Sequence, residues 1–168
     1  VMSYLDKELF VDCKIIENPQ FSLSSSEYES YHSFMSEAEK IYNEMTNLTN
    51  KYQVIKNEMV DFKSKIKPSK EKNILNEINS IVNEIGKWDK IMVQRLSKAY
   101  DDVENFENGF TAHYLHLLNE ADSGIPKLTK GSKIKLIELN KQWKDYKKRA
   151  KRLIDGKINE FNIKYKKD

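Results

Sequence analysis

The sequence predicts an all-α protein, a long antiparallel three-helix bundle whose helices run up, down and up. Apolar residues recur at steps of three and four along three long stretches, the spacing of one helix face. The 168 residues include only 5 Gly and 3 Pro, too few turn residues for a fold of many short strands. No stretch approaches the ~18 apolar residues of a membrane helix, so we expect no membrane span.

Residues 1–23 are expected to be an extended segment that precedes a helical domain at 24–168. Residues 8–17 form a compact cluster of β-branched and aromatic side chains, followed by Asn18-Pro19, and predict a strand. A single strand has no other strand to pair with in an otherwise helical chain. The segment at 8–17 therefore either lies along the bundle or is the last strand of a β-domain missing from this chain, and we favour the second.

The first residues and the single cysteine add two expectations. Val1 precedes Met2, which we interpret as a processed chain or a fragment of a longer one.

Cys13 lies within the strand-like cluster and is expected to be packed in the interior, because no histidine partner or electropositive setting marks it as a catalytic thiol. One cysteine also excludes an intramolecular disulfide.

The first long helix is predicted from about Ser25 to Lys67. Ser24-Ser25-Ser26-Glu27 supplies an N-cap and an acidic first turn, because the hydroxyl accepts from a free backbone N–H. An apolar stripe then runs from Tyr28 to Ile66 without a Gly or Pro to interrupt it.

The second helix is predicted after a turn at Pro68, with Ser69 as its cap. Its stripe includes Leu75, Ile78, Ile81, Trp88, Met92, Leu96, Tyr100 and Val103, and Glu107-Asn108-Gly109 is the expected end or bend. A short helix at 110–118 follows, within an irregular 104–122 segment that we expect to cross one end of the bundle.

The last helix is predicted to open at Thr129 to Ser132, after a break at 122–126. Its apolar stripe runs from Leu136 through Trp143 to Phe161, and Gly156 is a candidate kink.

Residues that could carry catalysis or bind a metal form no converging set, so we expect no enzyme activity, metal or cofactor. His113 and His116 lie at i, i+3, but no third ligand is evident, and solvated histidines, His32 included, are the better interpretation. The carboxylate pairs Glu37/Glu39 and Asp101/Asp102 are one or two residues apart and do not face each other on a helix.

Charge is distributed unevenly along the chain. Residues 126–168 carry 15 Lys and Arg against 5 Asp and Glu, although the whole chain has a net charge of only +3. A candidate basic surface consists of Lys141, Lys144, Lys148, Arg149, Lys151 and Arg152, with Lys147 beside it.

Two interpretations of this basic run stay open. It either binds nucleic acid or another anionic surface, or its lysines are solvated and pair with the acidic helices, which is the commoner use of helical charge runs. The nearby aromatic residues Trp143 and Tyr146 occupy core positions, where they cannot stack on bases, so nucleic acid is not the expected partner.

The order of motifs resembles the C-terminal helical tail of sortilin-like, BNR-repeat β-propeller proteins, often labelled glycosyl hydrolases. The matching segments are Phe110 to Leu118, Glu120-Ala121-Asp122-Ser123-Gly124-Ile125-Pro126, the helix after Ser132, and Ile158-Asn159-Glu160-Phe161-Asn162. The sequence departs from that family's pattern at Lys127-Leu128-Thr129, where Thr directly follows Pro in the family, and at Asn159, which replaces a Pro.

The resemblance implies a non-catalytic accessory or interaction domain of an exported bacterial protein. Any hydrolytic activity would lie in a propeller that this chain does not contain. The implied partners are that propeller or β-domain, or a second copy of the chain. The alternative from the residues themselves is a nucleic-acid or anionic-surface binding module that uses the basic C-terminal helix.

Overall fold

The structure is a computed structural model that describes residues 2–4, 7–14, 16, 18–67, 71–98 and 105–165. Its α-helices confirm the all-α class, and the longest of them has 41 residues. In chain order the helical elements are α1 (Ser25–Lys65), α2 (Lys72–Met92), α3 (Phe110–Asp122), α4 (Lys130–Leu153), the π-helical turn η2 (Ile154–Ile158) and α5 (Asn159–Tyr165). None of the described helices combines the length and apolar character needed to cross a bilayer.

Contacts between side chains give the directions of the helices. Glu44 of α1 contacts Lys147 of α4, and Phe62 of α1 meets Phe161 of α5 with ring centroids 6.1 Å apart, so α1 and the last helices run the same way. Lys63 near the end of α1 donates to Asn79 near the start of α2 at 2.7 Å, so α2 runs in the opposite direction.

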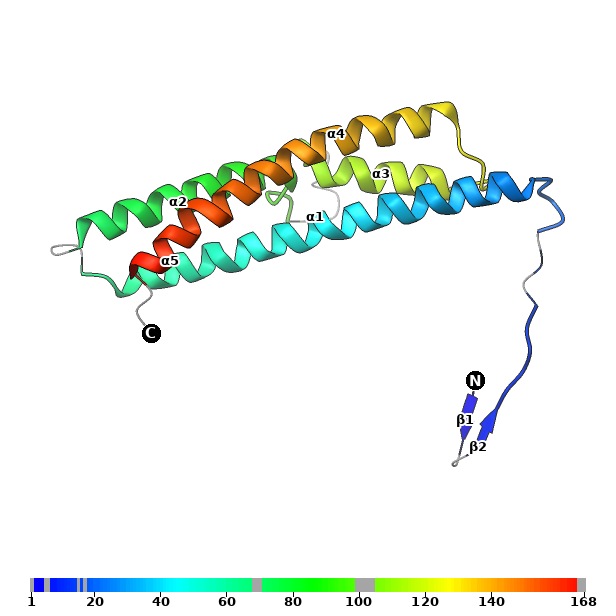
Figure 1. Ribbon diagram of the computed structural model, residues 1–168, viewed down its shortest axis with the longest axis horizontal. Helices are drawn as coiled ribbons and strands as arrows, with labels where there is room; N and C mark the ends of the chain where they lie inside the picture. The colour runs from blue at the N-terminus through cyan, green and yellow to red at the C-terminus, as the bar shows by residue number, and fades with distance from the viewer. Residues whose placement is uncertain are drawn as a thin grey trace.

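The middle pass of the chain consists of two helices, α2 and α3, placed one after the other along α1 (Figure 1). Tyr31 near the start of α1 donates to Asp122 at the end of α3 at 2.9 Å. The expected three-helix description is therefore too simple, and the prediction that residues 104–122 cross one end is wrong for α3. An amphipathic α3 buries more apolar surface along α1 and α4 than it would across their ends.

The second helix ends earlier than its apolar spacing predicts. α2 stops at Met92, and Leu96 lies beyond it with a 62% exposed side chain, while Tyr100 and Val103 are outside the described residues. The predicted cap Ser69 is also outside them, and the residue before α2 is Glu71, whose side chain makes no cap hydrogen bond.

The N-terminal segment forms a small hairpin instead of one longer strand. β1 (Met2–Tyr4) pairs antiparallel with β2 (Lys7–Leu9), with Met2 opposite Leu9. The strand predicted at 8–17 is wrong beyond residue 9, because residues 10–14 have no regular structure and Phe10 is 71% exposed. Strong β-propensity has no effect without a sheet face to pack on. The domain division at residue 23 stays a prediction.

The core lies between the facing stripes of the helices, with Tyr52, Ile78 and Leu139 among its fully buried side chains. Tyr52 and Trp88 meet edge to face at 4.8 Å, and each donates to a carbonyl of α4: Tyr52 to Ala150 at 2.8 Å and Trp88 to Tyr146 at 3.0 Å. These hydrogen bonds fix the position of α4 along the axes of α1 and α2, because a buried donor without an acceptor costs free energy.

Gly156 lies in η2, where α4 continues into α5. The backbone N–H of Asn159 reaches the carbonyl of Ile154, the wider spacing that defines a π turn. The irregularity expected at Gly156 is thus a local widening of the helix.

Candidate functional site

The basic side chains of the C-terminal helices fall into two groups. One group lies between helices and pairs with acidic residues of α1 and α2. Lys147 pairs with Glu44, Lys157 with Glu84, and Lys164 with Glu77 at 2.6 Å. The hydrogen bond from Lys147 lowers the pKa of Glu44, and that from Lys164 lowers the pKa of Glu77. The last helices thus present lysines to the acidic side chains of α1 and α2, as expected for a basic helix packed beside acidic ones, although each half-exposed pair contributes little to stability.

The second group lies on the side of α4 that faces away from the bundle. We call Lys141, Lys144, Lys148 and Arg152 the outer basic face; all four are exposed. At 3.6 residues per turn they occupy about 80° of the helix circumference. The described residues provide no ion pair or side-chain hydrogen bond for any of these four side chains.

The structure separates the other two predicted residues from this face. Arg149 lies on the flank of α4, with its guanidinium 5.8 Å from the ring centroid of Tyr146. Lys151 is 4.0 Å from Asp155, in the π-helical turn η2 that follows α4. The basic run as a whole does spread around the helix, as the sequence indicates. The sequence interpretation missed that four of its cations lie together on one side of α4 without a partner among the described residues.

Two exposed isoleucines on the same side of α4 were not found by sequence reasoning. Ile134 is 47% exposed and Ile137 is 69% exposed. At 3.6 residues per turn both lie within about 20° of the sector of the outer basic face, towards the N-terminus of α4. Their signal in the sequence is that they fall off the buried stripe formed by Leu136, Leu139 and Trp143.

The remaining predicted residues form no reactive set. His32, His113 and His116 are exposed, which confirms the solvated interpretation. Cys13 is exposed, so the expectation that it packs in the interior is wrong; the strand that would have buried it does not form. Within the described ranges, His, Cys, Asp and Glu side chains make no group of three that could hold a metal ion.

The acidic pairs are likewise separate side chains. Glu37 and Glu39 are both exposed, and Glu37 accepts a hydrogen bond from Asn140 of α4 at 2.7 Å. Asp101 and Asp102 are outside the described residues. An open surface depression of about 860 Å³ lies along α1 beside Lys147 of α4, and Ser36, Asn43 and Asn47 are among the residues that line it.

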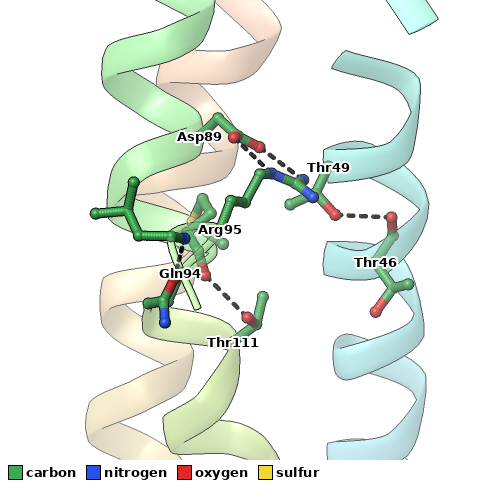
Figure 2. A network of polar contacts seen from close by, with 8 residues as sticks. Thr46, Thr49, Asp89, Gln94, Arg95 and Thr111 are labelled. Carbon is green, nitrogen blue, oxygen red and sulfur yellow. Dashed lines mark hydrogen bonds and ion pairs between the residues drawn. The ribbon is translucent and has the colours of Figure 1, made fainter. Parts of the chain in front are cut away.

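Polar and backbone contacts connect the C-terminal end of α2 to the N-terminal end of α3 (Figure 2). We call the residues that make them, Asp89, Met92, Arg95, Gly109 and Thr111, the α2–α3 joint. Asp89 near the end of α2 is only 5% exposed, and it accepts from Arg95 Nε at 2.7 Å and from Arg95 Nη2 at 2.9 Å. The hydrogen bonds of this bidentate ion pair raise the pKa of Arg95. Because Arg95 satisfies Asp89, the buried carboxylate has a structural role.

The other side of the joint is a close backbone contact. Thr111 Oγ1 donates to the carbonyl of Met92, the last residue of α2, at 2.9 Å. Gly109 packs so closely that a Cβ placed on it would lie 2.5 Å from that carbonyl oxygen. Both contacts end α2 at Met92 from outside the helix, because they occupy the space and the carbonyl that another turn would need.

Comparisons with known proteins provide no relative. No family model, no curated protein and no solved structure matches this chain.

Proposed function

We propose that this chain is a non-catalytic helical interaction module that binds an anionic macromolecule through the outer basic face of α4. The observation that supports it most is the contrast within the C-terminal helices. The lysines between helices pair with Glu44, Glu77 and Glu84, whereas the four cations of the outer basic face have no partner among the described residues.

The energetics of like charges strengthen this proposal. Lys144, Lys148 and Arg152 follow one another at four-residue steps, and like charges at this spacing destabilise a helix by about 0.2–0.5 kcal/mol per pair. Their spacing therefore does not stabilise the helix. A polyanion would gain from their concentration on one face, because the counterions released from its surface favour association at low salt.

Heparin, used as a generic polyanion, tests the proposal. We expect the full chain to be retained on immobilised heparin at low salt and to elute steeply as salt rises. The triple variant Lys141→Gln/Lys144→Gln/Lys148→Gln should elute much earlier, and removing three contacts should lower the slope of log K against log salt by about 2 to 3.

The matched control removes the same charge elsewhere. Lys51, Lys67 and Lys90 are exposed and form no ion pair or side-chain hydrogen bond with the described residues, so Lys51→Gln/Lys67→Gln/Lys90→Gln should elute close to the unaltered chain. Circular dichroism establishes that both variants stay helical. Failure of the unaltered chain to bind, or equal losses in the two variants, would contradict the proposed function.

The family resemblance adds a proposed setting for the module. Residues 110–162 supply the motifs for an accessory role beside a propeller in an exported bacterial protein, with that propeller or a second copy of the chain as a further contact. The coding sequence upstream of Val1 tests this setting: a propeller there supports it, and a start codon at Met2 contradicts it.

A further inference from the structure

We propose that the anionic partner of the outer basic face is the surface of a lipid bilayer that contains acidic phospholipids. This inference rests on the proposed function and names the partner of the same site. It depends on Ile134 and Ile137, which extend that face with exposed apolar side chains.

The shape of the surface fits a plane. From Ile134 to Arg152 the side chains concerned all lie on the outward side of α4, a helix without a break over this range. Eighteen residues of rise correspond to about 27 Å. Figure 1 shows the N-terminal part of α4 along one edge of the bundle, with α3 and α1 on its inner side, and all six side chains of the row are exposed.

The two kinds of side chain match the two layers of a bilayer surface. Lysine and arginine are attracted to acidic headgroups, and each contributes separately to the attraction. Isoleucine side chains gain when they leave water for the boundary between headgroups and acyl chains. Ile134 and Ile137 lie one turn apart at the N-terminal end of the row, so they can enter together while Lys141 to Arg152 lie against the headgroups.

The same features disfavour nucleic acid as the partner. A nucleic-acid surface would use exposed aromatic rings for stacking. Trp143 is only 3% exposed, and Tyr146 packs against Phe110 with ring centroids 4.9 Å apart. Exposed isoleucines beside a phosphate backbone would lose water without gaining an apolar environment.

The acidic side chains nearest to this row do not cancel its charge. Glu138 is 3.7 Å from Lys135, and Asp155 is 4.0 Å from Lys151, so each lies beside a cation that is not part of the outer basic face. Asp145 is exposed on the same helix and reduces the charge of the face by one.

Sedimentation with vesicles tests the inference on the full chain. The vesicles are phosphatidylcholine alone, or phosphatidylcholine with about one third phosphatidylglycerol. We expect binding to the acidic vesicles at least about tenfold tighter than to the neutral ones, and a loss of about tenfold or more in Lys141→Gln/Lys144→Gln/Lys148→Gln. Similar binding to both vesicles would overturn the inference.

A second variant separates the membrane from other polyanions. Ile134→Ser/Ile137→Ser should lower binding to acidic vesicles by about tenfold and leave retention on heparin unchanged. The control Val54→Ser/Val60→Ser alters two apolar side chains of α1 that are 56% and 50% exposed, and should change neither. Equal vesicle binding by the isoleucine variant and the unaltered chain would contradict the inference.

The heparin and vesicle experiments distinguish the two proposals. If heparin is bound through the outer basic face but acidic vesicles are not, the lipid inference fails and the proposed function stands. If a short DNA duplex is bound through that face while vesicles are not, the partner is a nucleic acid. If neither heparin nor vesicles are bound, both proposals fail.

Discussion

At the scale of single residues, Gly109 sets how closely the chain approaches the end of α2. A Cβ on this residue would lie 2.5 Å from the carbonyl oxygen of Met92 and 2.7 Å from Cα of Val93, both backbone atoms that cannot rotate away. We expect Gly109→Ala to lower the free energy of unfolding by about 1–3 kcal/mol, the usual cost of overpacking. Urea unfolding of the variant and of the unaltered chain measures this difference in the free energy of unfolding.

Gly86, inside α2, provides the opposite case. A Cβ there meets nothing within 4 Å, so Gly86→Ala should raise the free energy of unfolding by about 0.5–1 kcal/mol, because alanine loses less backbone entropy. If the two glycines respond alike, the tight contact at Gly109 does not exist in solution.

Arg95 and Asp89 give a second prediction for the α2–α3 joint. Arg95→Met should lower the free energy of unfolding by about 2–4 kcal/mol, because it leaves the buried Asp89 carboxylate without its partner. The double variant Asp89→Leu/Arg95→Met should recover most of that loss, since it removes both charges. Urea unfolding at neutral pH gives both values, and additive losses in the double variant would show that the two side chains act independently.

The candidate surface shows how far sequence reasoning reaches for single residues. All six predicted basic residues are exposed, and the charge excess of the last quarter of the chain pointed to them. Sequence reasoning could not separate these residues from Lys147 and Lys157, because the partners of those two lysines, Glu44 and Glu84, lie about a hundred and about seventy positions away in the sequence. Ile134 and Ile137 were missed because an isoleucine on a helix is normally interpreted as part of the core.

At the scale of elements, the N-terminus of α1 has a reciprocal capping box. Ser24 accepts from the backbone N–H of Glu27 at 3.3 Å, and the Ser24 backbone N–H donates to Glu27 Oε2 at 2.9 Å. That hydrogen bond and the nearby Lys127 lower the pKa of Glu27 to about 2. The cap therefore favours the ionised carboxylate.

This cap predicts a loss of stability in acid. In the unfolded chain Glu27 has its ordinary pKa of 4.5, so the unfolded state binds a proton that the folded state does not between pH 4.5 and about 2. The stabilisation is complete above pH 4.5 and is lost as the pH falls towards 2. The lowered pKa values of Glu44 and Glu77 act in the same direction.

Thermal unfolding from pH 7 to pH 2.5 measures the effect. Glu27→Gln should flatten the fall in melting temperature below pH 4.5. Glu29→Gln, at an exposed neighbouring position without an ion pair among the described residues, should leave the profile unchanged. An unchanged profile in Glu27→Gln would mean that the cap is not formed in solution.

The ends of the elements differ in how well a sequence defines them. Ser24 and Thr129 cap α1 and α4 with their own side chains, a local signal that sequence analysis found for both helices. The end of α2 has no such signal, because Gly109 and Thr111 impose it from the far side of the joint. Apolar spacing continues past Met92 to Leu96, so the pattern alone predicts a helix that is too long.

At the scale of the whole molecule, three groups of contacts determine which helices are neighbours. Tyr52 and Trp88 donate to carbonyls of α4, and Asn140 links Tyr114 of α3 to Glu37 of α1. The partners along α1 and α4 rise together, from 37 with 140 to 52 with 150. The sequence predicts a bundle because its stripes must be buried, and an up-down-up order already makes the first and last helices parallel. The pairings of Glu37 with Asn140 and of Tyr52 with Ala150 add how far along each other α1 and α4 lie.

Cross-linking in solution tests this arrangement. In a Cys13→Ser background, the pairs Glu44→Cys/Lys147→Cys and Glu77→Cys/Lys164→Cys place thiols at positions where the native side chains form ion pairs. A short bismaleimide should join each pair within one chain at low protein concentration, and the product should migrate faster than the unlinked monomer in denaturing electrophoresis.

The control pair is Glu44→Cys/Lys164→Cys, which combines one position from each cross-link. Lys164 lies 17 residues beyond Lys147, the partner of Glu44, so these two thiols should be about 25 Å apart at 1.5 Å of rise per residue and should not react with one short reagent. Swapped reactivity, with the control pair joined and the two ion-pair positions not, would require α4 to run opposite to α1. The outer basic face would then lie on a different side of the molecule, so this cross-link also tests the geometry on which both proposals depend.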